Sequence, residues 1–132
     1  MVRYHGGTVI DYPLPQVPIL YHIARQSDWT AALGAGSYAA ASLATEGFIH
    51  CSTAQQVIAT ANRLFKGRPD LVLLCIDSDR LNAEIRHENL EGGTEAFPHV
   101  YGVLPIAAVI AMHEFAPRND GSFELPPALR RA

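Results

Sequence analysis

The stretch LVLLCID, residues 71–77, constrains the fold more strongly than any other part of the chain. All of its residues are apolar except the last, Asp77. A strand with one face in water alternates apolar and polar side chains, whereas a strand buried on both faces is apolar throughout. These residues therefore predict a central strand that other elements cover on both sides.

The segments around this strand predict an α+β domain. Helical patterns with small or apolar residues on one face cover 27–36 and 53–65. Further strand-like segments lie at 19–24, 48–52, 83–88, 97–102 and within LPIAAVIAMHEF, residues 104–115. Because strands outnumber helices in the second half, we expect an α+β fold with about two main helices, not a doubly wound sheet.

The ends of the two predicted helices carry capping signals. Ser27 is the expected N-cap of the first helix, and Thr53 with Gln56 matches a capping box at the start of the second. Between the first helix and the strand at 48–52 we expect a loop that carries Tyr38 and Ser42.

The chain has 132 residues, which suits one domain. Residues 1–17 are rich in glycine and proline and predict an irregular arm, and residues 117–132 predict a loose tail. The compact domain is therefore expected over 18–116.

Charge and apolar content exclude several classes of protein. The net charge is -3 and Lys66 is the single lysine, which argues against tight nucleic-acid binding. No apolar run reaches the roughly 18 residues that a membrane span needs. Cys51 and Cys75 lie in apolar, strand-like runs, so we expect reduced, buried thiols and a cytoplasmic protein.

The segment EGFIHCS, residues 46–52, places polar chemistry on a short strand. Side chains alternate along a strand, so Phe48, His50 and Ser52 share one face. Ile49 and Cys51 share the other face, which we expect to be buried. An imidazole and a hydroxyl beside an aromatic ring are therefore candidates for the wall of a cleft.

Two further histidines lie in apolar, strand-like segments. His22 is part of ILYHIA, and His99 lies in FPHVYG with Tyr101 on the same face. A histidine in apolar surroundings needs a polar partner. We predict that His22, His50 and His99 converge on one cleft, with Ser52 and Tyr101 on its wall. The alternative is that they are unrelated core histidines.

Two other chemistries remain open as weaker alternatives. Three histidines can hold a catalytic zinc, although the spacing matches no HxH or HExxH motif. Ser52 or Cys51 is a candidate nucleophile, but Ser52 and His50 are separated by about 6 to 7 Å along the strand. The chain also lacks the GxSxG, GxGxxG and GxxxxGK[ST] motifs.

The motifs ILYHIA, EGFIHCS, DLVLLCID and FPHVYGVLPIAAV resemble, in this order, those of DUF952, a family of small bacterial proteins of unknown function. The resemblance covers about residues 18–115. That family is similar to a compact ADP-ribosyltransferase fold, especially to its RNA 2'-phosphotransferase branch. YHIA at 21–24 and HCS at 50–52 match the YHGT and HLS motifs of that branch. The resemblance implies a split, strongly bent antiparallel sheet whose central cleft binds NAD or an ADP-ribosylated group.

The resemblance also implies roles for single residues. His22 and His50 would be catalytic and would orient the ribose or nicotinamide end of the ligand. Glu88 or Glu95 would stabilise a charged ribose during cleavage of NAD. The remaining residues implied at the ligand are Tyr38, Ser42, Phe48, Ser52, His99 and Tyr101.

The match departs from the phosphotransferase pattern at several points. YHIA lacks the glycine and threonine of YHGT, and only Arg25 and Arg63 stand as candidates for holding a phosphate. These departures favour a second hypothesis, a ligand-binding or regulatory domain without catalysis. NAD enters both hypotheses as a ligand or substrate, and the sequence assigns no resident cofactor, protein partner or oligomeric state.

Overall fold

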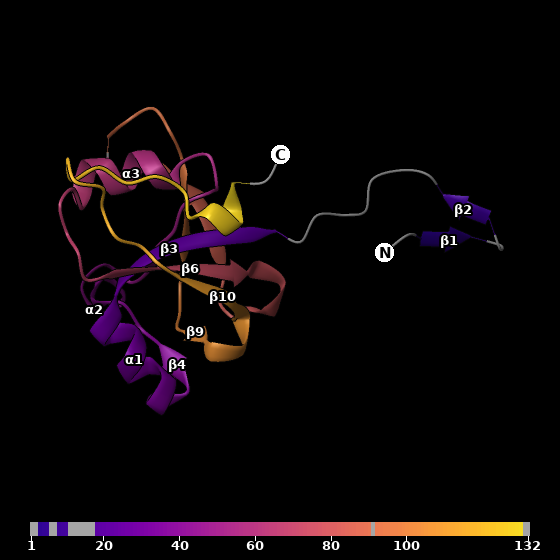
Figure 1. The fold of residues 1–132 in the computed structure, drawn as a ribbon. Coiled ribbons are helices and arrows are strands. Elements are labelled where there is room, and N and C mark those ends of the chain that lie inside the picture. The colour runs from indigo at the N-terminus through magenta and orange to yellow at the C-terminus, as the bar shows by residue number, and fades with distance from the viewer. Residues whose placement is uncertain (1–2, 6–7, 11–17, 91, 131–132) are drawn as a thin grey trace.

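The computed structural model describes residues 3–5, 8–10, 18–90 and 92–130. Its main part is an α+β domain in which two three-stranded antiparallel sheets pack together with helices (Figure 1). Within the N-terminal arm, β1 (Arg3–His5) and β2 (Thr8–Ile10) pair as an antiparallel hairpin. The other residues of the arm lie outside the described part of the chain.

The first sheet has the strand order β10 (Val109–Glu114), β6 (Leu71–Asp77), β3 (Ile19–Arg25). Every residue of β6 is buried, which confirms the predicted central strand. Its side chains divide between two apolar clusters. One face of the sheet contacts a cluster that includes Leu74, and the other face contacts a cluster that includes Leu73.

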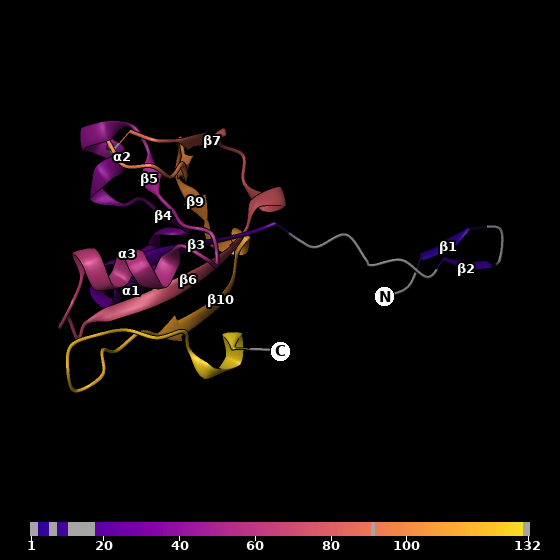
Figure 2. The same ribbon diagram turned by 90° about the horizontal axis from the view of Figure 1, so that it is seen from above.

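Different helices pack on the two faces of this sheet: they lie on opposite sides of β3 and β6 in Figure 1 and overlap when seen from above in Figure 2. Helix α1 (Gln26–Ala35) packs Trp29 and Ala32 into the cluster with Leu74. Helix α3 (Val57–Leu64) contributes Val57 and Ala61 to the cluster with Leu73. The two predicted helices are therefore confirmed, and they lie on opposite faces of the sheet.

The second sheet has the order β5 (Ile49–His50), β8 (Phe97–Val100), β7 (Ile85–Glu88). Val100 lies between Ile49 and Ile85 in the register, and Ile49, Val100 and Ile85 pack in the core shared with the first sheet. The next row of the register joins His50, His99 and Arg86. Since neighbouring positions on a strand point to opposite faces, this polar row lies on the side away from the core.

Shorter elements complete the domain. β4 (Ser37–Tyr38) pairs with β9 (Leu104–Pro105), and α2 (Ala41–Glu46) leads into β5. The described residues form three single-turn 3₁₀ helices, at Ser78–Arg80, Ile106–Ala108 and Pro127–Leu129. No helix in the described ranges is long and apolar enough to cross a membrane.

The start of each main helix differs from the capping prediction. Helix α1 begins one residue before Ser27, with Arg25 at the N-cap position and no side-chain cap. The backbone N–H of Thr53 donates to Oε1 of Gln56 at 3.1 Å, as a capping box requires of Gln56. Residues 54–56 nevertheless form a turn, and α3 begins only at Val57.

The expected loop and tail are more ordered than the sequence suggested. The segment with Tyr38 and Ser42 forms β4 and α2 instead of an irregular loop. In the C-terminal segment Phe123 is buried and stacks on Phe115 with ring centroids 4.8 Å apart. The backbone N–H of Phe123 also donates to Oδ1 of Asn62, so the described part of this segment is packed against α3 and is not loose.

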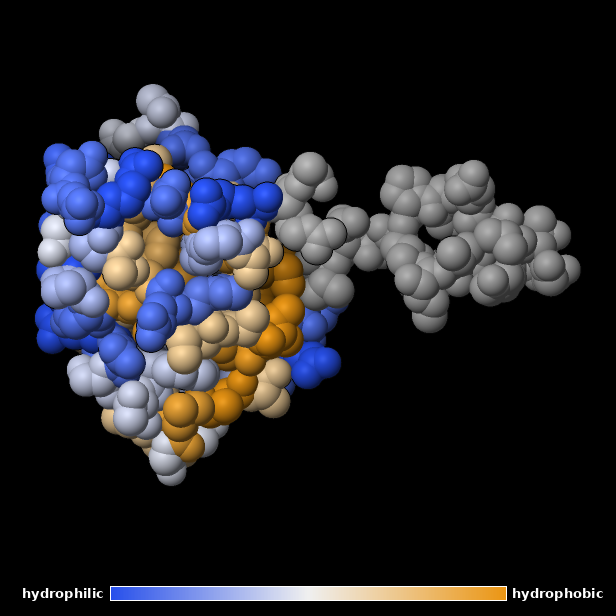
Figure 3. Space-filling model, in the orientation of Figure 1, coloured by the Kyte–Doolittle hydropathy of each residue, from blue (hydrophilic) through white to orange (hydrophobic). Residues whose placement is uncertain are grey.

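One face of the domain carries an apolar strip. Figure 3 shows it over the region of β9 and β10. The exposed large apolar side chains of these strands and of the loop before β9 are Val103, Ile110 and Met112.

Candidate functional site

A split between β3 and β5 opens a cavity at the junction of the two sheets. Tyr21 and Ser52 exchange two backbone hydrogen bonds of 2.8 Å, which form an isolated antiparallel bridge. If this ladder continued, the next hydrogen-bonded pair would be Ile23 and His50. Instead, Nδ1 of the His22 imidazole lies 2.6 Å from the carbonyl oxygen of His50. A side-chain hydrogen bond thus replaces the next backbone hydrogen bond between β3 and β5, and the two strands separate beyond it.

The hydrogen bonds of His22 fix its tautomer. A carbonyl oxygen only accepts, so Nδ1 carries the hydrogen and donates to His50. Nε2 lies 2.8 Å from the Tyr38 hydroxyl and accepts from it. Burial lowers the pKa of His22 to about 4, so the ring is neutral at physiological pH. Both ring nitrogens of His22 are hydrogen-bonded to protein groups. His22 therefore holds the strands in their separated arrangement and offers no nitrogen to a ligand.

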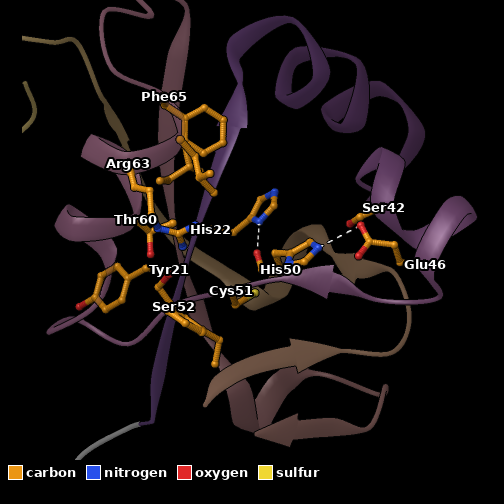
Figure 4. A pocket seen from close by; sticks show the side chains of 13 residues that line it. Tyr21, His22, Ser42, Glu46, His50, Cys51, Ser52, Thr60, Arg63 and Phe65 are labelled. Atoms are coloured by element: carbon orange, nitrogen blue, oxygen red, sulfur yellow. Dashed lines mark hydrogen bonds and ion pairs between the residues drawn. The ribbon is translucent and has the colours of Figure 1, made fainter. Parts of the chain in front are cut away.

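The cavity at this split has a volume of about 340 Å³ and two contrasting walls. Figure 4 shows Ser42, Glu46 and His50 on one side, from α2 and β5. Thr60, Arg63 and Phe65, from α3 and its C-cap, lie on the other. His22 of β3 lies between the two walls in Figure 4, and the lining also includes Tyr21, Ile23, Cys51, Ser52, Leu64 and Phe97.

The wall formed by α2 and β5 carries a hydrogen bond between His50 and Glu46. Nε2 of His50 lies 3.1 Å from Oε2 of Glu46, and the two side chains are 40% and 50% exposed. Both groups can therefore reach a ligand. The Ser42 hydroxyl donates to the carbonyl oxygen of Phe48 at 2.7 Å. Gly47 ends α2 with φ +92°, a left-handed conformation that favours glycine, and this turn brings Glu46 beside His50.

A second group of polar side chains lies directly behind His50. Nδ1 of His99 is 2.9 Å from Oε1 of Glu88, and the Tyr101 hydroxyl donates to the same oxygen at 2.6 Å. The hydrogen bond from Tyr101 and the contact with His99 lower the pKa of Glu88. Glu88 is thus a carboxylate, and Nδ1 of His99 is the donor. We call Tyr101, Glu88 and His99 the Glu88 triad.

Phe48 joins the triad to the cavity wall. Its ring stacks on His99 with centroids 4.1 Å apart and meets the edge of His50 at 4.9 Å. The rings of His50 and His99 are nearly perpendicular, with centroids 5.3 Å apart. His99 is fully buried, and its Nε2 has no hydrogen-bond partner among the described residues.

Glu95 lies at a neighbouring cavity of about 320 Å³. Arg63 and Phe97 line both cavities, so the second one adjoins the first. Gln56 holds the chain segment that carries Glu95 in place. Its side-chain amide donates to the carbonyl oxygen of Ala96 at 2.8 Å and contacts Oε2 of Glu95 at 3.5 Å.

The structure divides the sequence-predicted site residues into three groups. His22, His50, Ser42 and Ser52 line the main cavity. A second group lies behind His50 and does not line the main cavity: His99, Tyr101, Glu88 and Phe48. Tyr38 is buried behind His22, and Glu95 lines the neighbouring cavity.

Seven lining residues were not among the sequence-predicted site residues: Tyr21, Ile23, Glu46, Thr60, Leu64, Phe65 and Phe97. Glu46 precedes His50 by four positions, but this spacing indicates a contact only once the turn at Gly47 is known. Thr60 belongs to α3 and Phe65 is its C-cap, and the sequence pattern of this helix indicated only packing.

The alternative chemistries find little support in this geometry. Burial raises the pKa of Cys51 to about 12 and that of Cys75 to about 11, so neither is a ready thiolate. Both cysteines are free and buried, as expected. Ser52 is buried, and its backbone is held by the bridge to Tyr21. Within the described ranges, no three His, Cys, Asp or Glu side chains are grouped so that they could hold a metal ion.

Comparisons with known proteins agree with this architecture. The family model described as "Protein of unknown function (DUF952)" matches residues 23–112. The crystal structure of protein CC0527 from Caulobacter crescentus has a TM-score of 0.73 and 31% sequence identity, and the match covers 81% of this chain and 94% of that one. The solution NMR structure of CC0527 gives a TM-score of 0.74 at 31% identity, over 86% and 97% of the two chains. No curated protein matches significantly.

Proposed function

The chain belongs to the DUF952 family, whose description assigns no function, and on that premise we propose that the cavity between β3 and β5 binds a nucleotide of the NAD or ADP-ribose class. The observation that carries the proposal is the split itself. His22 opens an edge of the first sheet toward the second, and the opening is lined by polar groups on one side and by a cation and aromatic rings on the other.

The two walls suit the three parts of a nucleotide. Glu46 and His50 are half exposed and can accept from or donate to ribose hydroxyls. The Arg63 guanidinium suits a phosphate, which it can contact through two parallel hydrogen bonds. Phe65 and Phe97 offer apolar surface for a base or a nicotinamide ring.

The size of the cavity limits how much of such a ligand it can hold. A volume of about 340 Å³ is near the lower end of the roughly 300 to 1,000 Å³ found for small-molecule sites. One nucleoside half would fit there. The other half would extend past Arg63 and Phe97 into the neighbouring cavity beside Glu95.

Under this proposal His22 and Tyr38 act indirectly. The resemblance to the transferase fold implied a direct bond from His22 to the ligand, but both of its nitrogens are engaged by protein groups. His22 would hold the His50 backbone in place, and Tyr38 would hold His22. The groups left to contact the ligand are then His50, Glu46, Ser42 and Arg63.

Cleavage of NAD is the second candidate function, and it is favoured by the carboxylate at the cavity wall. Loss of nicotinamide leaves a positively charged ribose, which a nearby carboxylate stabilises electrostatically. Glu46 lines the cavity, whereas Glu88 is bound to His99 and Tyr101 and Glu95 lies in the second cavity. Release of nicotinamide by the wild type but not by Glu46→Gln would support catalysis. Binding without release would support the non-catalytic domain.

Thermal unfolding in the presence of ADP-ribose tests the binding proposal. A ligand at 100 times its dissociation constant stabilises the folded state by about 2.7 kcal/mol. For a domain of this size that corresponds to a rise in melting temperature of roughly 8 to 15 °C. Arg63→Ala should reduce the rise, while Arg80→Ala should not, because Arg80 pairs with Asp77 away from the cavity. No rise at millimolar ADP-ribose or NAD would refute the proposed ligand class.

A further inference from the structure

The neighbouring cavity carries a carboxylate, Glu95, and shares a cation with the main cavity. Arg63 lines both cavities, and it is the single lysine or arginine among the described residues that line either one. Glu46 lines the main cavity alone, and Glu95 lines the second cavity alone. The lining therefore presents a carboxylate in each cavity and a cation common to both. This order is complementary to a ribose, a diphosphate and a second ribose, because ribose hydroxyls donate to carboxylates and phosphates accept from a guanidinium.

The side chain of Gln56 fixes the position of Glu95. Oε1 of Gln56 accepts from the backbone N–H of Thr53 at 3.1 Å, which anchors this side chain in the turn before α3. Its Nε2 donates to the carbonyl oxygen of Ala96 at 2.8 Å and lies 3.5 Å from Oε2 of Glu95. Each carboxylate oxygen can accept more than one hydrogen bond, so the Gln56 contact leaves acceptor capacity on Glu95. Glu95 is also exposed, and a ligand in this cavity can therefore reach its carboxylate.

The two cavities suit different halves of a dinucleotide. Cleavage of NAD at Glu46 requires the nicotinamide ribose in the main cavity, which leaves the second cavity for adenosine. Asn89 and Thr94 line the second cavity and have oxygen atoms that can accept from the exocyclic amine of adenine. Phe97 offers apolar surface for the base. Glu95 is then the carboxylate available to the adenosine ribose.

We propose that Glu95 is the specificity-determining residue of this site, which accepts from the 2'- and 3'-hydroxyls of the adenosine ribose and excludes ligands with a 2'-phosphate. This inference rests on the proposed function, since it requires a dinucleotide-type ligand across the two cavities. A 2'-phosphate removes a hydroxyl that donates to the carboxylate and places negative charge beside it. Such repulsion is a general way for a site to reject a close analogue of its ligand. The ligand class is thereby narrowed to ADP-ribose and NAD, without their 2'-phosphorylated counterparts.

Calorimetric titration with two ligands that differ by one phosphate tests this inference. The ligands are ADP-ribose and ADP-ribose with a phosphate on the 2' oxygen of its adenosine ribose. In the wild type the Kd of the phosphorylated ligand should be at least about ten-fold higher, because like charges repel at a partly solvated contact. In Glu95→Gln the two constants should lie within about three-fold of each other, because glutamine keeps an oxygen acceptor but carries no charge.

Glu84→Gln is the matched control. It makes the same change of charge outside both cavities, where Glu84 pairs with Arg86 at 3.0 Å, and it should keep the wild-type ratio of the two constants. If ADP-ribose binds but the wild type does not discriminate, or prefers the phosphorylated ligand, this inference is overturned and the nucleotide site stands. The same conclusion follows if Glu95→Gln keeps the wild-type ratio or binds neither ligand. If neither ligand binds the wild type at millimolar concentration, the proposed function and this inference are both overturned.

Discussion

Lowering the pH should destabilise this domain in part through one buried residue, His22. The folded state holds His22 neutral, with its pKa lowered to about 4 by burial, whereas the unfolded chain has the ordinary value of about 6.5. Between these values the unfolded state binds more protons than the folded state, so stability falls as the pH falls. The contribution of His22 is fully present above pH 6.5 and is lost progressively toward pH 4.

The size of the effect follows from the same two values. A difference of one pKa unit corresponds to about 1.4 kcal/mol, so lowering the pKa from 6.5 to about 4 corresponds to about 3 kcal/mol. Most of this should be lost by pH 4.5. For a domain with a free energy of unfolding of about 5 to 15 kcal/mol, that is a large fraction of the total.

Urea unfolding at pH 7, 6, 5 and 4.5 measures this loss, and His22→Asn is the matched variant. Asparagine does not titrate and can keep a donor near the His50 carbonyl. Its absolute stability should be lower because it loses the contact with the Tyr38 hydroxyl. Its slope against pH should nevertheless be smaller by the contribution of His22, since other titrating groups are common to both proteins. Equal slopes in the two proteins would refute the assignment of a neutral, buried His22.

Three further expectations concern β5 and the cysteines. Ile49→Ala should lower the free energy of unfolding by about 2 to 5 kcal/mol, because Ile49 is fully buried. His50→Ala should lower it by only about 1 kcal/mol, because the His50 side chain is half exposed. If urea unfolding ranks the two variants in the opposite order, His50 is a core residue. Ellman's reagent should find no reactive thiol in the native protein and both Cys51 and Cys75 after denaturation without reductant; failure to find them would indicate a disulfide. Stability should also fall above about pH 9, since both thiols keep their protons in the folded state while the unfolded chain loses them, and a flat profile between pH 8 and 10.5 would contradict this.

The sequence predicted the central parts of the fold because their patterns are typical of one kind of element. A short, continuous apolar run rich in Val, Leu and Ile favours a strand covered on both faces, and β6 is fully buried over Leu71–Asp77. The alternation correctly predicted that Ile49 and Cys51 are buried and that His50 borders the cavity, but Phe48 and Ser52 are buried as well. Polar Ser42 and the small alanines around it show no such pattern, so the sequence predicts a loop where the structure has α2 and β4.

The site was predicted less completely, because it depends on contacts that no short-range pattern encodes. The sequence indicated His22 and His50 as site residues. It did not indicate that the His22 imidazole would donate to the His50 carbonyl in place of a backbone hydrogen bond. Glu46 approaches His50 only because the chain turns at Gly47. Arg63 faces both residues across the cavity from α3, which is distant from them in sequence. The pairing of His99 with Glu88 likewise follows from the register of β7 and β8, not from their spacing in sequence.

Titration of ¹⁵N-labelled protein with ADP-ribose, followed by amide chemical-shift mapping, tests the central claim most directly. The claim predicts saturable shifts that concentrate on the two sides of the split, at Ile23, His50 and Thr60, with smaller changes at Glu95 in the neighbouring cavity. The apolar strip at Ile110 and Met112 should not respond. An absence of shifts at millimolar ligand, or shifts confined to residues away from the split, would contradict the assignment of this cavity as a nucleotide site.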